Sequence, residues 1–181
     1  MNAYDRQKAI EAVLYILNVT QGLDYYKVFK VLYFAEREHL KEWGTRILAD
    51  DFVAMKYSPV PTNLYNAAKQ DQYDDESSTF SSLFDSVIGL YNADGSNFLY
   101  SKREADLDYL APSDIECLDR AIKEYSKRSF SELLNLSHDS AWEEAPHLGT
   151  LKPEEMARAA GAHEDIVEYV REQEPIDNAL S

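Results

Sequence analysis

Cysteine is almost absent from this sequence, because Cys117 is the only one in 181 residues. A single thiol cannot close an internal disulfide, and it cannot supply the several thiolates of a zinc or iron–sulfur site. Long apolar runs are also missing, since no segment approaches the roughly 20 residues that span a bilayer. The N-terminal segment carries charges and has no apolar core, so we expect no signal peptide and a cytoplasmic protein.

Glycine and proline are scarce as well, with six of each. Such low numbers exclude a fibrous chain, and the hydrophobic share of 45% is enough to build a core. The length is typical of one domain. We therefore expect one domain over residues 1–150, and a C-terminal helical extension over residues 151–181 that packs on this domain or trails from it.

Positive charge is under-represented, with 18 Lys and Arg against 33 Asp and Glu and a net charge of −15. Nucleic-acid affinity comes largely from Lys and Arg that displace counterions from phosphates, so direct DNA or RNA binding is disfavoured. The charge either keeps the protein in solution or steers a partner with a basic surface toward it. The 13 tyrosines suit interfaces, because each ring carries a hydroxyl that needs a partner or water.

Helical periodicity dominates the N-terminal third. A first helix is predicted to begin near Asp5, where apolar residues start to recur at spacings of three and four. Asp24 is a suitable N-cap and Gly44 a suitable stop for a second helix over Tyr25–Trp43. Apolar side chains cover much of the circumference of that helix, so we expect it to be buried at the centre of the fold. Thr62 is expected to cap a third helix.

Shorter apolar pieces predict a small β element. One extended segment is expected over residues 51–57, and two short strands over Val87–Tyr91 and Asn97–Lys102. The residues between the two later strands, Asn92–Ser96, are typical of a turn. The fold class is therefore mainly α, with a small β part (α+β).

Two further segments are expected to lack regular structure. Ser58 and Val60 each precede a proline, which disfavours helical backbone angles, so Tyr57–Pro61 is predicted to be a stiff, irregular turn. Residues 70–82 are acidic and rich in serine, and we interpret them as a flexible loop or insertion.

Capping signals mark the helices of the C-terminal half. Ser113 with Glu116 and Ser129 with Glu132 each have the spacing of a capping box. Pro153 suits the first position of a later helix. The last nine residues, QEPIDNALS, are expected to be frayed.

A Glu-x-x-His spacing, Glu36 to His39, is the one pattern that suggests a metal site. On a helix it places two ligands on one face, as in di-iron bundles. Such sites need a second copy of the pair and two further glutamates from other helices. We interpret the pair as part of a solvated helix face, and we expect neither a metal nor a cofactor.

The consecutive residues Ser137, His138 and Asp139 suggest a hydrolase triad only superficially. Neighbours in sequence cannot converge on one atom as a triad does, and the Gly-x-Ser-x-Gly elbow is missing. His138 is interpreted as a structural residue whose ring meets unpaired carbonyls at a helix end. Asp50-Asp51 is interpreted as an ordinary acidic loop. Because no phosphate-binding or dinucleotide motif is present either, we expect the protein not to be an enzyme.

Three blocks carry a resemblance by their order and spacing. The first is Tyr26–Leu40, the second runs from Gly44 to Pro61 and ends Tyr-Ser-Pro-Val-Pro, and the third is Leu133–Trp142, with its Leu-Ser-His. Together they resemble the SocA-like, or Panacea, antitoxin family of bacterial toxin–antitoxin loci and phages. Ser58 stands where the family usually has Gly, and Met55 where it often has Trp.

The resemblance implies a compact, mainly helical domain that binds and neutralises a cognate toxin protein by direct contact. It carries over five candidate partner-binding residues: Lys30, Tyr57, Pro59, Val60 and His138. It also carries over three residues of the family motif that we expect to be structural: Leu32, Tyr33 and Trp142. Because the predicted turn is stiff, its two residues Pro59 and Val60 are expected to make contact with the partner.

Two other classes of function stay open at this point. One is a phage-associated or regulatory adaptor that binds a host protein and has no toxin partner. The other is an uncharacterised hydrolase, which requires a pocket that contains His138 and a nucleophile from another segment. The identity of the toxin and the oligomeric state do not follow from the sequence.

Overall fold

Helices make up most of the described chain. The computed structural model describes the backbone of residues 1–69, 75–93 and 95–180, and the side chains of these residues outside 75–78 and 174–180. The helices are α1 (Ala3–Thr20), α2 (Tyr25–Trp43), α3 (Thr62–Lys69), α4 (Asp75–Val87), η1 (Leu107–Tyr109, a 3-10 helix), α5 (Pro112–Tyr125), α6 (Phe130–Ser137), α7 (Ser140–Glu144), α8 (Pro153–Ala159) and α9 (Glu164–Leu180). The strands are β1 (Leu23–Asp24), β2 (Phe52–Met55), β3 (Ser58–Pro61), β4 (Ile88–Ala93) and β5 (Ser96–Ser101). The expected mainly helical fold with a small β part is confirmed, and none of the helices in the described ranges is long and apolar enough to cross a membrane.

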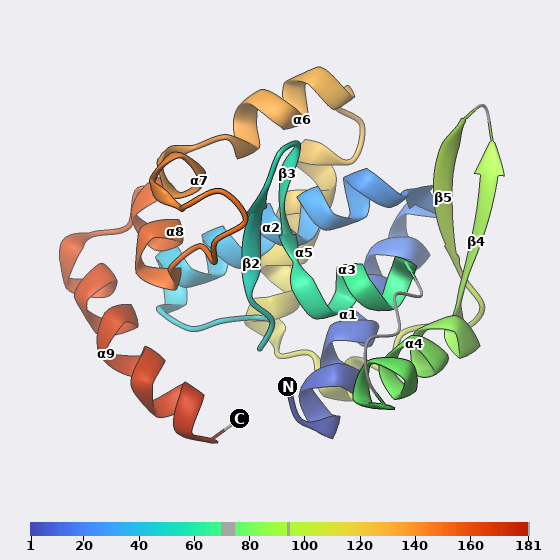
Figure 1. Ribbon diagram of the computed structural model, residues 1–181, viewed down its shortest axis with the longest axis horizontal. Coiled ribbons are helices and arrows are strands. Elements are labelled where there is room, and N and C mark those ends of the chain that lie inside the picture. Colours follow the sequence, from blue (N-terminus) through green and yellow to red (C-terminus); the bar gives the residue numbers. More distant parts are fainter. Residues whose placement is uncertain (70–74, 94, 181) are drawn as a thin grey trace.

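Helix α2 runs through the middle of the molecule and is the element on which the others pack (Figure 1). The side chain of Asp24 accepts hydrogen bonds from the amides of Tyr26 and Lys27, and Gly44 ends the helix with a φ of 65°. Its buried residues lie on several faces, because α1, α5, α6, α8, α9 and β3 all contact it. Both the bounds of this helix and its central place are as the sequence predicted.

Strands β2 and β3 form a hairpin, so the prediction of an irregular turn at Tyr57–Pro61 was wrong for Ser58–Pro61. Val53 pairs with Val60, and Ala54 with Pro59. The Ala54 amide donates to the Gly149 carbonyl, on the side of β2 that faces away from β3. Because successive residues of a strand point their backbone N–H and C=O groups to opposite sides, those of Val53 and Met55 point toward β3. The nitrogens of both prolines in β3 therefore lie on the side away from β2, where no donor is needed.

The β4–β5 hairpin projects from the opposite side of the molecule from α9 (Figure 1). These two strands confirm the predicted pair, displaced by a residue or so at each end. Within the predicted turn, Asn92, Ala93 and Ser96 belong to the strands, and Asp94 lies outside the described residues. The short strand β1 was not predicted, and it adds to β5 to give the order β1-β5-β4.

Three other expectations need correction. Residues from Asp75 onward form α4 instead of a loop, and residues 70–74 lie outside the described part of the chain. Helix α5 is capped by Asp114, which accepts a bond from the Ala111 amide, and not by a Ser113 box. The backbone of the C-terminal segment is helical to Leu180 and not frayed. By contrast, the Ser129–Glu132 capping box is confirmed.

Asp50 is a structural residue that caps a helix from a distance. Its carboxylate accepts hydrogen bonds from the amides of Asn63 and Leu64, at 3.0 Å each. Helix α3 is therefore capped by a buried aspartate twelve residues before its start, and not by Thr62 as predicted. Burial raises the pKa of the Asp50 carboxyl, and these hydrogen bonds oppose that shift.

Glu36 and His39 do not form a solvated face, because both are buried. Glu36 accepts hydrogen bonds from the amides of Ile47 and Leu48 at 3.1 and 3.0 Å, and burial raises its pKa to about 7. The His39 ring lies 2.7 Å from the Thr45 carbonyl, in the segment after α2, and 3.1 Å from the Ser113 hydroxyl of α5. Glu36 and His39 therefore hold the segment after α2 against that helix. The described residues contain no group of three acidic, His or Cys side chains placed to hold a metal.

Candidate partner-binding surface

Asp139 joins the central helix to the segment between α6 and α7. Its carboxylate accepts hydrogen bonds from the hydroxyl of Tyr33, at 2.7 Å, and from the guanidinium of Arg37. It also caps α7 by accepting a bond from the Trp142 amide. Burial, followed by the charge of Asp139, raises the pKa of Tyr33 well above its usual value, so this hydroxyl acts as a donor. We call Tyr33, Arg37 and Asp139 the Asp139 network.

Lys30 lies one turn before this network and is fully buried. Its ammonium group donates a hydrogen bond to the Ser137 hydroxyl and lies 5.1 Å from the centre of the Tyr26 ring. Burial lowers the pKa of Lys30 to about 7, and the negative charge of Asp139 opposes that shift. Ser137 is also fully buried, and its hydroxyl donates to the Leu134 carbonyl. No substrate can reach this hydroxyl in the observed conformation.

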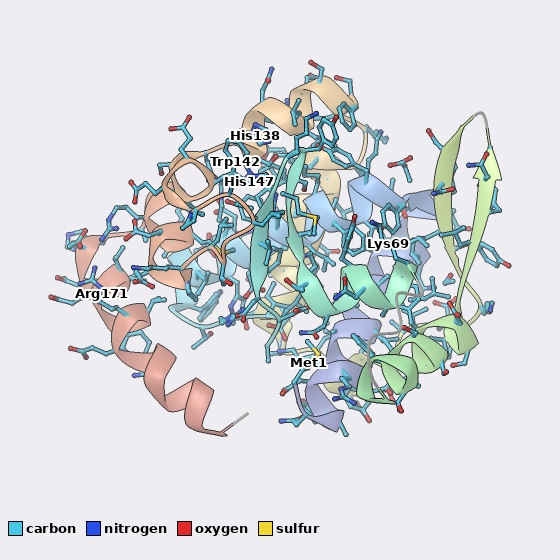
Figure 2. All side chains as sticks on the ribbon, viewed as in Figure 1. Met1, Lys69, His138, Trp142, His147 and Arg171 are labelled. Carbon is cyan, nitrogen blue, oxygen red and sulfur yellow. The ribbon has the colours of Figure 1, made fainter. Side chains whose placement is uncertain are left out.

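His138 ends α6 and stacks flat on Trp142 (Figure 2), with ring centres 3.7 Å apart. The backbone amide of His138 bonds to the Leu134 carbonyl. The ring was predicted to meet unpaired carbonyls at this helix end, but its Nε2 atom is buried and has no hydrogen-bond partner among the described residues. Burial and the charge of Lys30 lower the pKa of His138, so the stacked ring is the neutral form. The indole of Trp142 donates to the Met55 carbonyl at 3.0 Å, which ties α7 to the β2–β3 hairpin.

The turn of the β2–β3 hairpin meets the start of α6 at a group of aromatic rings. The Tyr26 hydroxyl donates to the Tyr57 carbonyl at 2.8 Å and holds the turn against α2. The Phe130 ring lies 4.5 Å from the ring of Tyr26 and 6.3 Å from that of Tyr57. Tyr57 is 52% exposed and Phe130 is 50% exposed. We call Tyr26, Tyr57 and Phe130 the tip patch.

The rest of the hairpin strand lies beneath this surface. Pro59 and Val60 are buried, and so is Ser58, whose hydroxyl donates to the Pro59 carbonyl at 2.6 Å. Ser58 is not among the described residues with positive φ. The backbone at this position therefore has no need of a glycine, and the hairpin tolerates the serine that stands where the resembling family usually has Gly.

The structure thus brings most of the candidate residues into one region but exposes few of them. Tyr57 is exposed and His138 half-buried, whereas the other three partner-binding candidates, Lys30, Pro59 and Val60, are buried. The motif residues Leu32 and Tyr33 are also buried, and Trp142 is partly buried.

Several residues of this region were missed from the sequence: Tyr26, Arg37 and Phe130 as parts of the surface or its support, and Ser137 and Asp139 as structural partners. The Ser129–Glu132 capping box does place Phe130 at the exposed first position of a helix. No local signal, however, shows that this ring meets a hairpin more than 70 residues earlier in the chain.

Comparison with known proteins gives one match. The family model described as "Antitoxin SocA-like, Panacea domain" matches residues 28–143, well over half of the chain. The matched range runs from the fourth residue of α2 through most of α7, and it contains the whole Asp139 network and Tyr57 and Phe130 of the tip patch. No curated protein and no solved structure matches the chain.

Proposed function

This chain belongs to the SocA-like, Panacea-domain antitoxin family, and on that premise we propose that it binds and neutralises a cognate toxin protein by direct contact in the cytoplasm. The observation that carries the proposal is the tip patch, where Tyr57 and Phe130 present two half-exposed rings side by side. Exposed aromatic rings on a fixed support are typical of residues that dominate binding energy at protein interfaces.

The buried candidates support this surface from behind. Lys30 and the Asp139 network connect α2 to the end of α6, and Trp142 connects α7 to the hairpin. Pro59 and Val60 lie in the strand that leads away from Tyr57. A rigid turn loses little conformational entropy on binding, so these contacts favour affinity without touching the toxin. In this proposal Tyr57 and Phe130 make contact, and His138 lies at the margin.

The toxin in this proposal has a basic surface. The net charge of −15 gives the antitoxin a long-range field that attracts a positively charged protein and repels other acidic ones. Such a field acts mainly on the association rate, whereas the rings of the tip patch determine how long the complex lasts. Neutralisation then proceeds by occlusion of the toxin and needs no chemistry from the antitoxin.

The test uses the protein encoded beside this one as the toxin. Expression of that neighbour alone should stop growth, and co-expression with the antitoxin should restore it. Tyr57→Ala and Phe130→Ala should each weaken the purified complex about 30-fold, which corresponds to about 2 kcal/mol, and should reduce the rescue. Tyr4→Ala is the matched control, because Tyr4 is 57% exposed on α1, outside the family match.

Two results would contradict the proposal at different levels. A neighbour that is harmless alone, or that stays lethal with the antitoxin present, would refute antitoxin activity and favour the adaptor function. A rescue that survives the loss of both rings would keep antitoxin activity but place the binding surface elsewhere. Circular dichroism of each variant separates a lost contact from a lost fold.

A further inference from the structure

Strand β4 is the outer strand of the three-stranded sheet, with β5 between it and β1, and within the described residues no strand pairs with its other edge (Figure 1). The Lys102 amide bonds to the Val87 carbonyl directly opposite it. Because hydrogen-bonded pairs alternate in an antiparallel ladder, Gly89 and Tyr91 direct their backbone groups toward β5. Leu90 and Asn92 direct theirs away from β5, toward the open edge.

This edge lacks the features that usually protect edge strands. Natural edges carry charged side chains, especially Lys, or proline, which prevent another strand from pairing. Residues 88–101 contain no proline and a single charged residue, Asp94, in a chain of which 28% is charged. A neutral segment in so acidic a protein can approach another backbone without a penalty from buried carboxylates.

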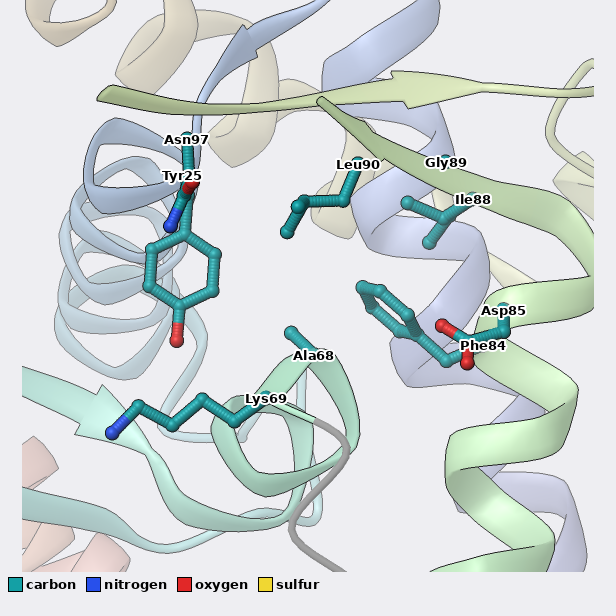
Figure 3. Close-up of a pocket in the computed structure, with 9 residues that line it drawn as sticks. All are labelled: Tyr25, Ala68, Lys69, Phe84, Asp85, Ile88, Gly89, Leu90 and Asn97. Carbon is teal, nitrogen blue, oxygen red and sulfur yellow. The ribbon is translucent and has the colours of Figure 1, made fainter. Parts of the chain in front are cut away.

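A pocket of about 330 Å³ lies under the same strand. Figure 3 shows Ile88, Leu90 and Phe84 pointing into the space between the β4–β5 hairpin and Ala68 of α3. Its volume is at the lower end of the range for ligand pockets, about 300–1,000 Å³, so it suits one large side chain better than a cofactor. Leu90, which borders the pocket, is 50% exposed.

The other face of the hairpin is aromatic. Tyr91 stacks on Phe98 at 5.5 Å and lies 6.1 Å from the ring of Tyr100. The Tyr100 ring lies directly over Gly89, because any side chain at that position would collide with it. A strand added beside β4 would therefore place alternate side chains on two different surfaces. One is the pocket, where Ile88, Leu90 and Phe84 supply apolar contacts beside the polar groups of Lys69, Asp85 and Asn97, and the other is the aromatic face.

We propose that the edge of β4 binds an extended, uncharged segment of a partner protein by strand addition, with one large apolar side chain of that segment in the pocket. The outward backbone groups of Leu90 and Asn92 specify an extended backbone, and the pocket selects a side chain directly opposite Leu90. The lack of charge on residues 88–101 matches an uncharged segment. This site is separate from the tip patch and does not depend on antitoxin activity.

The first test removes one outward backbone donor and keeps the backbone hydrogen bonds between β4 and β5. The probe is the capped peptide Thr-Val-Phe-Val-Thr, titrated into the full-length protein by calorimetry, with a Thr-Val-Ala-Val-Thr peptide to measure the contribution of the pocket. Asn92→Pro deletes an amide that only an added strand would use, and it should weaken binding about fivefold or more. Asn92→Ala is the matched control, because it also removes the side-chain bond to Asn97 but keeps the amide.

The second test adds charge to the edge. Leu90→Lys should abolish peptide binding, whereas Leu107→Lys, at an equally exposed leucine of η1, should not. Absence of binding at about 1 mM peptide, or equal binding by Asn92→Pro and Asn92→Ala, would overturn the proposal. A dimer of the wild type that Leu90→Lys dissociates would also overturn it, since a second copy would then occupy the edge.

Discussion

Lys30→Met should change how the stability of this protein depends on pH. Lys30 is fully buried, and its pKa falls from 10.5 to about 7 on folding. Between these pH values the unfolded chain holds a proton that the folded chain lacks, so the free energy of unfolding rises with pH. The slope approaches about 1.4 kcal/mol per pH unit. From pH 7.5 to 9.5 the wild type should therefore gain about 2.5 kcal/mol relative to Lys30→Met.

Met fits this position because it is unbranched, apolar and close to Lys in length. The Ser137 hydroxyl keeps its bond to the Leu134 carbonyl when the ammonium group is gone. Replacement of a buried charge by an apolar side chain of similar volume is often stabilising by about 1–4 kcal/mol. At pH 7 and below, the variant should accordingly be more stable than the wild type.

The measurement is urea unfolding of both proteins at intervals from pH 6 to 9.5, followed by tryptophan fluorescence and circular dichroism. The series stops there because unfolded tyrosines begin to ionise near pH 10, and burial raises the pKa of Tyr15 to about 12 in the folded protein. Lys27→Met is the matched control one turn earlier on α2, where the ammonium group donates to the Ser126 carbonyl and the side chain is partly solvated. A gain in stability with pH that the Lys27→Met comparison also shows would not come from the burial of Lys30.

The titration of Lys30 also gives a direct readout in the unmodified protein. An NMR titration of the Lys30 side chain should show a transition near pH 7. A difference curve between wild type and Lys30→Met that stays level from pH 7.5 to 9.5 would refute the reasoning. Such a result would mean that the ammonium group stays charged inside the folded protein.

Two further substitutions test other parts of the fold. Asp139→Ala leaves the guanidinium of Arg37 buried without its carboxylate partner, and the unfolding free energy should fall by about 3–5 kcal/mol in urea denaturation; a loss below about 1 kcal/mol would contradict the central role given to this network. Gly44→Ala forces a side chain into left-handed backbone 2.7 Å from the Tyr169 ring, whereas Gly161→Ala, also at positive φ, meets nothing within 4 Å. Both should lower the free energy of unfolding by about 1 kcal/mol of backbone strain, and Gly44→Ala should lower it more. Equal losses in urea denaturation would show that the Tyr169 contact has no effect.

Local signals in the sequence were sufficient for several elements. Asp24 and Gly44 delimit α2 because a cap and a left-handed stop act within one turn of the helix that they bound. The predicted Ser129–Glu132 capping box was confirmed for the same reason. Asp50 shows the limit of such signals, because it caps α3 although it lies twelve residues before the helix begins. In the sequence alone it resembles an ordinary acidic loop residue.

The β2–β3 hairpin was not predicted because closely spaced prolines are compatible with either an irregular turn or an edge strand. It cannot donate to a ladder, so two prolines in four residues indicate an irregular turn. At an edge strand the same residues are tolerated where their nitrogens face away from the partner, which is their position in β3. Whether a proline nitrogen faces a neighbour depends on the register with β2 and on the segment at Gly149, neither of which is encoded locally.

The residues that mark the family and the exposed rings of the tip patch, which is the proposed binding surface, are different sets. Lys30, Tyr33 and Trp142 are recognisable in sequence because each has a partner in a distant segment, and such contacts tolerate few replacements. Phe130 has no comparable constraint, since its ring is half-exposed and contacts only other rings of the tip patch among the ring contacts found in the described residues. The buried contacts keep the hairpin in place, whereas a change at the exposed position of Phe130 leaves these contacts intact. Under the proposed function, the exposed rings are therefore the positions that can change without loss of the fold.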